Sequence, residues 1–213
     1  MQQIIDKINK IIPDLKNSAK EILLEFQKNL NKNNDELFVE LCFCIIVANN
    51  SIENGLRAYN SIGLNFLKLE EKELKEKLKT TSRRFYNKRA EYIIETRKKH
   101  KELIEKIEEL KNKKIEEYIF RDWLVENIKG FGYKEASHFM RNLGFFNFAI
   151  LDRHILKFLY KENLLEKLPT SLNKKNYLEI EKLLIKLAKK LNISMAELDI
   201  YLFYIDSGRL CEK

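Results

Sequence analysis

Glycine and proline are scarce in this chain, and their scarcity limits the folds that it can adopt. Only six glycines and two prolines occur among 213 residues, where an average chain of this length would hold roughly 25 of the two together. All-β sandwiches and barrels place both residues at their many turns, so the count argues strongly against them. Since 45% of the residues are hydrophobic, the chain can still bury a core. The sequence therefore predicts an all-α protein.

Hydrophobic residues recur at helical spacing along most of the chain, which predicts about ten helices. Pro13 should interrupt the first of these patterns, so that a second helix runs from Leu15 to Leu30. Asp35 should cap the buried helix that follows, and a further helix should span Arg83–Lys98. No repeat or long linker separates independent domains. We therefore expect residues 1–213 to form a single unit of two interleaved helical lobes around a cleft.

The formal net charge of +8 is concentrated in two stretches of the chain. Residues 83–101 carry a local charge of about +6 and residues 129–161 about +4, counted as in the net charge. Clusters of this kind are typical of surfaces that bind a polyanion such as nucleic acid. The alternative is that these lysine-rich helices merely present a solvated face.

Cysteine usage and hydropathy predict a cytoplasmic protein that has no membrane partner. The longest apolar run, Leu41–Ala48, is far shorter than the roughly 20 residues that span a bilayer. Cys42 and Cys44 lie within this run, so we expect them to be buried free thiols in a reducing compartment. Because no C-x-x-C pair occurs, we expect no metal site, no iron–sulfur cluster and no cofactor.

Half of the glycines, Gly130, Gly132 and Gly144, fall within 15 residues. Apolar faces on both sides of Gly130 and Gly132 predict two helices joined by a tight hairpin, a helix-hairpin-helix at about residues 116–144. Glycines let a backbone approach a ligand closely, and the free N–H groups at the start of the second helix favour an anion. The alternative is an ordinary turn between helices with a glycine C-cap.

Two side chains near this hairpin could carry chemistry. Lys134 lies on the first turn of the second helix, where the positive end of the helix dipole favours the neutral amine that a nucleophile requires. Asp152 follows 18 residues later, at the start of the next helix. The spacing alone leaves open that Lys134 is a solvated lysine and that Asp152 is only an N-cap.

The run VENIKGFGYKEASHFMRNLGFFNFAILDRHILKFL resembles the helix-hairpin-helix motif and following aspartate of the DNA glycosylase superfamily. More narrowly, it is similar to the archaeal-type 8-oxoguanine DNA glycosylase/AP lyases found in archaea and some bacteria. The blocks ELCFCIIVANN, RRFYNKRAEYI, NYLEIE and ELDIYLFY extend the similarity over most of the chain from about Asp35. The first 34 residues match poorly, and the loop FFNFAIL lacks the glycine and proline of the wider superfamily.

The resemblance implies a role for each matching residue. It implies that Lys134 is the nucleophilic amine, that Asp152 is the catalytic carboxylate, and that the hairpin glycines bind a DNA phosphate. The base pocket that it implies consists of Phe85, Phe203 and Lys213, although in isolation both phenylalanines would favour core packing. The DNA-binding residues that it implies are Gly130, Gly132, Asn49, Asn50, Arg153 and His154. The charge of the basic stretch adds Arg84, Lys88 and Arg89 as candidates for phosphate binding, with the alternative that any one of them is merely solvated.

The implied function is base excision by a monomeric enzyme on double-stranded DNA that contains a damaged base. A lysine nucleophile forms a Schiff base with the sugar, so removal of 8-oxoguanine and cleavage of the strand by β-elimination are expected together. Three alternatives stay open at this point. The chain could be a glycosylase for another oxidised or mismatched base, a non-catalytic helix-hairpin-helix DNA-binding protein, or a helical scaffold for protein interactions.

Overall fold

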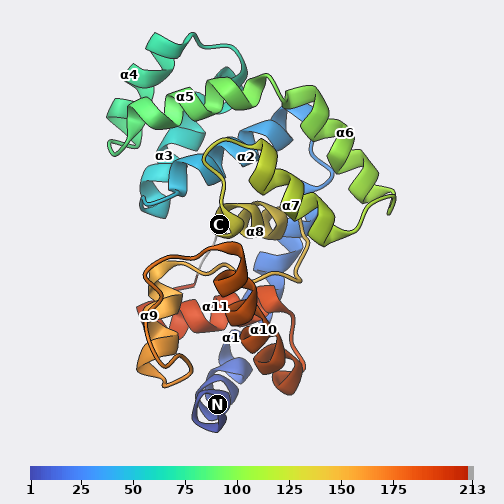
Figure 1. Cartoon of the computed structure of the whole chain (residues 1–213), viewed down its shortest axis with the longest axis vertical. Helices are drawn as coiled ribbons and strands as arrows, with labels where there is room; N and C mark the ends of the chain where they lie inside the picture. The colour runs from blue at the N-terminus through green and yellow to red at the C-terminus, as the bar shows by residue number, and fades with distance from the viewer. Residues whose placement is uncertain (211–213) are drawn as a thin grey trace. The chain divides into compact units, whose positions relative to one another are not determined.

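Helices account for all of the regular structure in residues 1–210, which are the residues that the computed structural model describes, and no strand occurs among them (Figure 1). The prediction of an all-α fold is therefore confirmed. The elements are α1 Gln2–Asn29, α2 Asn34–Val47, α3 Ile52–Ile62, the 3-10 helix η1 Gly63–Leu67, α4 Glu71–Thr81, α5 Tyr86–Arg97, α6 His100–Lys111, α7 Glu117–Asn127, α8 Tyr133–Asn142, α9 Arg153–Lys161, α10 Lys174–Leu191 and α11 Met195–Ser207. Within the described part of the chain, none of these helices is both long and apolar enough to cross a bilayer.

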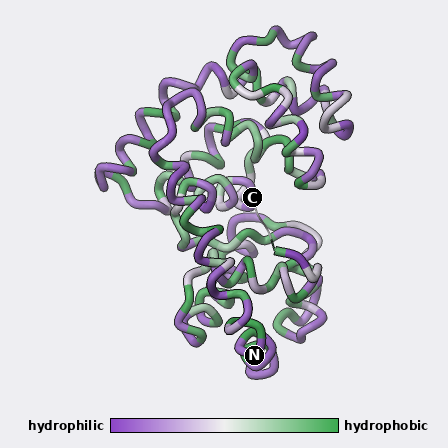
Figure 2. Tube along the Cα trace, turned by 180° about the vertical axis from the view of Figure 1, so that it is seen from behind, coloured by the Kyte–Doolittle hydropathy of each residue, from purple (hydrophilic) through white to green (hydrophobic). Residues whose placement is uncertain are grey.

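The helices form two compact units that are not consecutive in sequence. Unit 1 combines residues 1–28 with residues 140–213, so both ends of the chain contribute to it, and unit 2 consists of residues 29–139. Along the helices of both units, hydrophobic residues alternate with hydrophilic ones (Figure 2), as expected for helices that bury one face. The single domain and the cleft that we expected stay predictions.

Unit 2 is built around α2, which is buried along nearly its whole length from Leu37 to Val47. This helix begins with a capping box in which Asn33 Oδ1 accepts from the Glu36 N–H at 2.9 Å and Glu36 Oε2 accepts from the Asn33 N–H at 3.1 Å. The prediction that Asp35 is the cap was wrong, because Asn33 and Glu36 have the spacing that satisfies two terminal amides at once. Cys42 and Cys44 are fully buried, as predicted, and burial raises the pKa of the Cys42 thiol.

Unit 1 begins with α1, a single helix of 28 residues that continues through Pro13. The predicted break at this proline was therefore wrong. A proline inside a helix costs about 3 kcal/mol, but the buried face keeps its register on both sides of Pro13, with Ile4 and Ile8 before it and Leu15, Ala19 and Phe26 after it. Each large apolar side chain buried on this face contributes about 2 kcal/mol. The apolar face therefore outweighs the missing hydrogen bond.

The helix predicted at Arg83–Lys98 begins later than expected, at Tyr86. Arg83 and Phe85 both adopt a positive φ, of 62° and 51°, which a continuous right-handed helix excludes. The preceding segment is therefore a strained turn rather than a helical one. Its conformation decides how the first residues of the basic stretch are presented.

Candidate active site and nucleic-acid interface

The predicted hairpin is present between α7 and α8, and its backbone permits only glycine at position 130. Gly130 has a φ of +88°, and a Cβ atom placed on it would lie 2.3 Å from Tyr92 Cδ2 on α5. Phe131 turns inward and packs edge-on against Phe139, with ring centroids 6.5 Å apart. The hairpin backbone is thus seated directly against α5, which the sequence did not indicate.

Polar contacts between α7 and α8 hold the hairpin in place. Arg121 Nη1 donates to Ser137 Oγ at 3.2 Å, and its guanidinium lies 5.2 Å from the ring of Tyr133. The Tyr133 hydroxyl donates to Asp122 Oδ1. Because Arg121 and Ser137 are buried, these contacts are shielded from water and fix the two helices on each other.

The start of α8 differs from the open anion site that the sequence predicted. The Gly132 carbonyl accepts the first helical bond, from the Ala136 N–H at 3.0 Å. The Gly132 N–H itself donates to Glu135 Oε2 at 3.2 Å. Glu135 therefore completes half of a capping box, and its carboxylate lies where an anionic ligand of this amide would lie. We missed this residue, although its position three residues after Gly132 is the signal of such a cap.

Lys134 is partly buried beside this cap. Its side chain is 22% exposed, and Nζ lies 3.8 Å from Glu135 Oε1. One oxygen of Glu135 thus faces the hairpin amide and the other faces the amine. The alternative of a fully solvated lysine is not what the structure shows.

Phe85 lies outside the core, contrary to what its helical surroundings favoured. Its side chain is 58% exposed and precedes α5 on the left-handed backbone described above. The guanidinium groups of Arg84 and Arg89 lie 5.5 and 5.8 Å from its ring. An exposed aromatic ring on a strained backbone is more typical of a binding site than of a packing residue.

Arg89 is an internal brace, which corrects the expectation that it contacts phosphate. The residue is 3% exposed, and its guanidinium donates to the Ala48 carbonyl at 2.7 Å, to the Arg84 carbonyl and to Ser82 Oγ at 3.5 Å. Burial, with a smaller contribution from Arg84, lowers its pKa to about 10, so it stays protonated at neutral pH. Arg89 therefore ties the end of α2 to the turn that precedes Phe85.

The two asparagines between α2 and α3 play different parts in the same network. Asn50 Nδ2 donates to the Ser82 carbonyl at 3.1 Å and Asn50 Oδ1 accepts from Asn54 Nδ2 at 3.0 Å, so this side chain fixes the turn. Asn49 is exposed and has a φ of +54°. Asn49 and Phe85 are thus two exposed residues on left-handed backbone, and the contacts of Arg89 and Asn50 connect the turns that carry them.

In unit 1, Asp152 is the N-cap of α9. Its Oδ1 accepts from the Ile155 N–H at 2.8 Å, so the alternative that Asp152 serves as an N-cap is confirmed. A cap of this kind needs one carboxylate oxygen, and the side chain is only partly buried. Capping fixes the position of the carboxylate at the helix start without excluding a chemical role.

The segment that precedes Asp152, residues 145–151, lacks glycine and proline and is held by side chains of α10. The Tyr177 hydroxyl donates to the Ala149 carbonyl at 2.6 Å and accepts from the Leu151 N–H at 3.3 Å. Glu181 Oε1 accepts from the Ala149 N–H at 2.9 Å. Both side chains belong to the block NYLEIE, so these contacts give that block a structural role. Sequence reasoning assigned no function to either residue.

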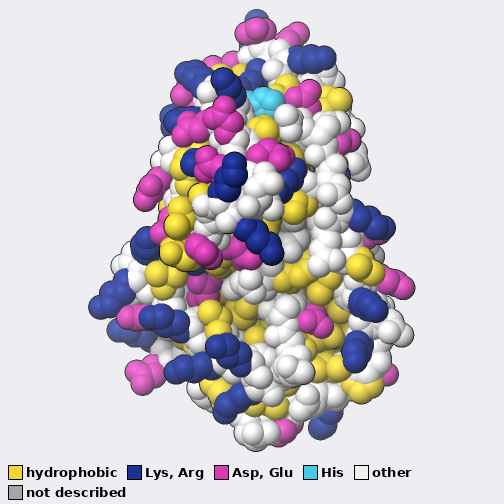
Figure 3. Space-filling view, turned by 90° about the vertical axis from the view of Figure 1, so that its right-hand side faces the viewer, with side chains coloured by type: hydrophobic (Ala, Val, Ile, Leu, Met, Phe, Trp, Pro, Cys, Tyr) yellow, Lys and Arg dark blue, Asp and Glu magenta, His cyan; other side chains and the backbone are white. Residues whose placement is uncertain are grey.

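The remaining predicted residues are mostly at the surface. Arg84, Lys88, Arg153 and His154 are exposed, and His154 Nδ1 lies 3.4 Å from Asp206 Oδ2. Phe203 is partly exposed on α11, and Lys213 lies outside the described residues. On the face drawn in Figure 3, Lys and Arg side chains are intermixed with Asp and Glu rather than forming an unbroken basic surface. In residues 1–210, no group of three or more His, Cys, Asp or Glu is placed to hold a metal ion.

Comparison with known proteins covers nearly the whole chain. The family model for 8-oxoguanine DNA glycosylase, Ogg-HhH, matches residues 19–193. The 8-oxoguanine DNA glycosylase/AP lyase of Methanocaldococcus jannaschii is 46% identical over 94% of this chain and 97% of its own length. Its counterpart from Thermotoga sp. is 38% identical over 99% of both chains. The alignment with the Thermotoga protein extends over the first 34 residues, whereas the family model begins at residue 19, so the poor match that we expected there stays a prediction.

Solved structures agree with these sequence matches. The M. jannaschii 8-oxoguanine glycosylase/lyase, crystallised in complex with a 15mer DNA containing 8-oxoguanine, superposes with a TM-score of 0.91 at 41% identity, covering 98% of this chain and 99% of that one. The Thermotoga maritima 8-oxoguanine DNA glycosylase superposes with a TM-score of 0.91 at 36% identity and covers 99% of both chains. Sequence and structure together show that this chain belongs to the helix-hairpin-helix 8-oxoguanine DNA glycosylase family.

Proposed function

We propose that this chain removes 8-oxoguanine from double-stranded DNA with Lys134 as the nucleophile and Asp152 as the assisting carboxylate. The activity itself, 8-oxoguanine DNA glycosylase with AP lyase, is that of relatives which match this chain over nearly its full length, one of them solved with DNA containing 8-oxoguanine. The observation that carries the assignment of Lys134 is its position, partly buried at the first turn of α8, directly after the glycine hairpin.

The reaction begins with extrusion of the damaged nucleotide from the duplex, which costs a few kcal/mol in lost stacking and pairing. Phosphate contacts by the hairpin and by the exposed basic residues Arg84 and Lys88 offset this cost. Phe85, which is exposed, supplies an aromatic face against which a base can stack. Asn49 is also exposed, and its side chain enters the position that the extruded base leaves in the stack.

The chemical steps need an amine that can lose its proton. Lys134 Nζ, as the neutral amine, attacks C1′ of the deoxyribose while the glycosidic bond breaks and the base leaves with that electron pair. The ionised Asp152 stabilises the positive charge that develops on the sugar. Ring opening gives an imine between Lys134 and C1′. The imine acidifies the hydrogens at C2′, so loss of one of them expels the 3′ phosphate and cleaves the strand.

Borohydride trapping tests this assignment, because reduction converts the imine into a stable covalent adduct. On a duplex with one 8-oxoguanine, the wild-type protein should give an adduct that Lys134→Gln abolishes. Lys186→Gln removes an exposed lysine of α10 and should trap normally. If the wild-type protein gave no adduct on 8-oxoguanine but did so on another damaged or mismatched base, the substrate would be wrong. If it gave none on any lesion or abasic site, the enzymatic function would be wrong.

Asp152→Asn separates chemistry from folding at the second position. Asparagine is as good an N-cap as aspartate, so α9 should begin as before. The single-turnover rate of base release should nevertheless fall by roughly 100-fold or more, since the charge on the side chain is lost. An unchanged rate would restrict Asp152 to its capping role. The monomeric state, the cytoplasmic location, the absence of a cofactor and the absence of a membrane partner stay predictions.

A further inference from the structure

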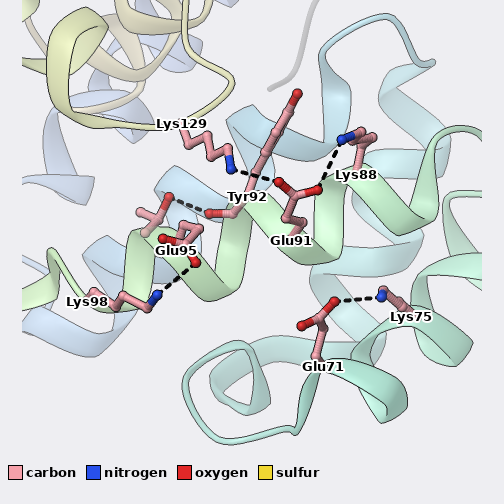
Figure 4. Close-up of polar contacts among 9 residues, drawn as sticks. Glu71, Lys75, Lys88, Glu91, Tyr92, Glu95, Lys98 and Lys129 are labelled. Carbon is pink, nitrogen blue, oxygen red and sulfur yellow. Dashed lines mark hydrogen bonds and ion pairs between the residues drawn. The ribbon is translucent and has the colours of Figure 1, made fainter.

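Glu91 on α5 joins two lysines that come from different parts of unit 2. Its Oε1 lies 2.7 Å from Nζ of Lys129, the residue that precedes Gly130 in the hairpin, and its Oε2 lies 3.2 Å from Nζ of Lys88 on α5 (Figure 4). All three side chains remain accessible, Lys129 being 50% and Lys88 67% exposed. One carboxylate therefore holds two ammonium groups at the surface, beside the hairpin.

The neighbouring ion pairs of α4 and α5 lack this arrangement. Glu95 pairs with Lys98, three residues further on, and Glu71 pairs with Lys75, four residues further on, so each carboxylate holds one lysine within about one helical turn (Figure 4). Pairs of this kind are common on helix surfaces and contribute little. Glu91 instead pairs with Lys129, which lies 38 positions further along the sequence. The pair with Lys129 is therefore a property of the fold and not of helical spacing.

The backbone of the hairpin is fixed where this bridge forms. Gly130 lies against the ring of Tyr92, the residue after Glu91, and the Lys129 ammonium is 5.9 Å from the centre of the same ring. The bond from Lys129, followed by that from Lys88, lowers the pKa of Glu91, and the bond to Glu91 raises the pKa of Lys129. The Glu91 carboxylate and the Lys129 amine are thus both charged at neutral pH, and Nζ of Lys88 is held at the same carboxylate.

We propose that Lys88 and Lys129 form a binding site for one backbone phosphate of DNA, and that Glu91 occupies this site in the free protein. A phosphodiester has two non-bridging oxygens that share one negative charge, as a carboxylate does. It can therefore replace Glu91 by accepting from one lysine at each oxygen. The site lies next to the hairpin and continues its phosphate-binding surface along α5. This inference rests on the proposed function, because the ligand is the DNA on which the enzyme acts.

Occupancy by Glu91 has a consequence for affinity. A phosphate must first displace the carboxylate, so the ion pairs of Glu91 oppose DNA binding. Exposed pairs are weak, and their loss should change the dissociation constant by only about two- to fivefold. Glu91→Gln should therefore bind DNA more tightly, whereas Lys88→Gln and Lys129→Gln should each bind more weakly and reduce the slope of log affinity against log salt by about 1.

Salt-dependent binding of a short undamaged duplex, measured by fluorescence anisotropy, tests the proposal. Glu95→Gln is the matched control, because it removes the same charge from the same helix one turn away. Glu95 acts on Lys129 through its charge, whereas Glu91 also bonds to it, so the control isolates the effect of charge alone. Glu91→Gln should tighten binding by more than Glu95→Gln does. The excess should disappear in the Lys129→Gln background, as a double-mutant cycle requires for a shared contact.

Equal effects of the two glutamate substitutions, an excess that persists without Lys129, weaker binding by Glu91→Gln, or an unchanged salt slope in Lys129→Gln would each overturn the proposal. The substituted side chains are exposed or half-exposed, and thermal unfolding of each variant verifies that it is folded. Borohydride trapping by the wild-type protein on 8-oxoguanine, carried out alongside, separates the two hypotheses. Failure to trap contradicts the proposed function, whereas trapping without the excess contradicts only the phosphate site.

Discussion

Lys134 follows a hairpin whose shape is set by two glycines and by contacts with neighbouring helices. Asp152, by contrast, follows a segment that lacks glycine and proline and is held by side chains distant in the sequence. Around the hairpin, Gly130 has a left-handed backbone and Glu135 caps Gly132 from three residues away. Before Asp152, the backbone groups of Ala149 and Leu151 are bonded to Tyr177 and Glu181, which lie 26 to 32 residues further along the chain.

This difference decides what each segment tolerates. A hairpin whose left-handed backbone packs closely against a neighbouring helix should fail when even one methyl group is added to it. A segment held by hydrogen bonds from another helix should tolerate substitutions of its own residues. It should lose its conformation when the distant donors or acceptors are removed. Substitutions in each segment therefore test this difference.

The largest effect is expected at Gly130. In Gly130→Ala, the new Cβ would meet the Tyr92 ring at 2.3 Å while the φ of +88° stays unfavourable. Backbone strain and overpacking together should lower the free energy of unfolding by about 3 kcal/mol. Urea denaturation measures this loss.

Gly208→Ala provides the control for backbone strain alone. Gly208, the C-cap of α11, has a left-handed backbone with a φ of +70°, and a Cβ atom there would meet nothing within 4 Å. Its substitution should cost about 1 kcal/mol. Equal losses for the two variants would mean that the contact between Gly130 and Tyr92 does not shape the hairpin.

A smaller effect is expected when the support of the second segment is removed. Tyr177→Phe keeps the ring but leaves the Ala149 carbonyl and the Leu151 N–H without their partner, so the free energy of unfolding should fall by about 2 kcal/mol. Because Asp152 follows directly, the single-turnover rate of base release should also fall, by roughly tenfold.

Tyr160→Phe is the matched control, since it removes the hydroxyl of an exposed tyrosine on α9 and should change neither quantity. A full rate in Tyr177→Phe, together with the expected loss of stability, would show that the segment before Asp152 can relax without moving the carboxylate. The contrast between the two segments would then concern stability alone.

What could be predicted from the sequence follows the same division between local and distant contacts. The glycine hairpin, the apolar faces of α7 and α8, and the capping box of Ser194 and Glu197 are local patterns, and the structure contains them. The inward position of Arg89 and the hydroxyl bonds of Tyr177 depend on residues 26 or more positions away. No local spacing encodes such partners, so one was misjudged and the other missed.

Phe85 and Pro13 show a third kind of limit, in which a local rule is correct but outweighed. Phe85 has the spacing of a core residue, yet the left-handed turn at residues 83–85 turns it outward. Pro13 has a local free-energy cost that predicts a break, yet burial of the continuous apolar face of α1 contributes more free energy than this cost. Tertiary packing decides both outcomes, and packing is what a single sequence expresses least directly.

The smallest expected effect concerns Glu135, the local support of the hairpin. Glu135→Ala removes the acceptor of the Gly132 N–H, which should cost about 0.5 to 1 kcal/mol of stability. The same change frees an amide at the start of α8 and deletes a negative charge beside Lys134, so affinity for DNA should rise about two- to threefold. Urea denaturation measures the loss of stability, and fluorescence anisotropy measures the gain in DNA affinity.

Glu36→Ala isolates the capping effect, because Glu36 occupies the same position in the capping box of α2 and accepts from the Asn33 N–H. It should lose similar stability and leave DNA affinity almost unchanged. If Glu135→Ala lost stability without binding DNA more tightly, its carboxylate would not compete with phosphate for the Gly132 amide. The hairpin would then resemble the segment before Asp152 in having its backbone donors used only for structure.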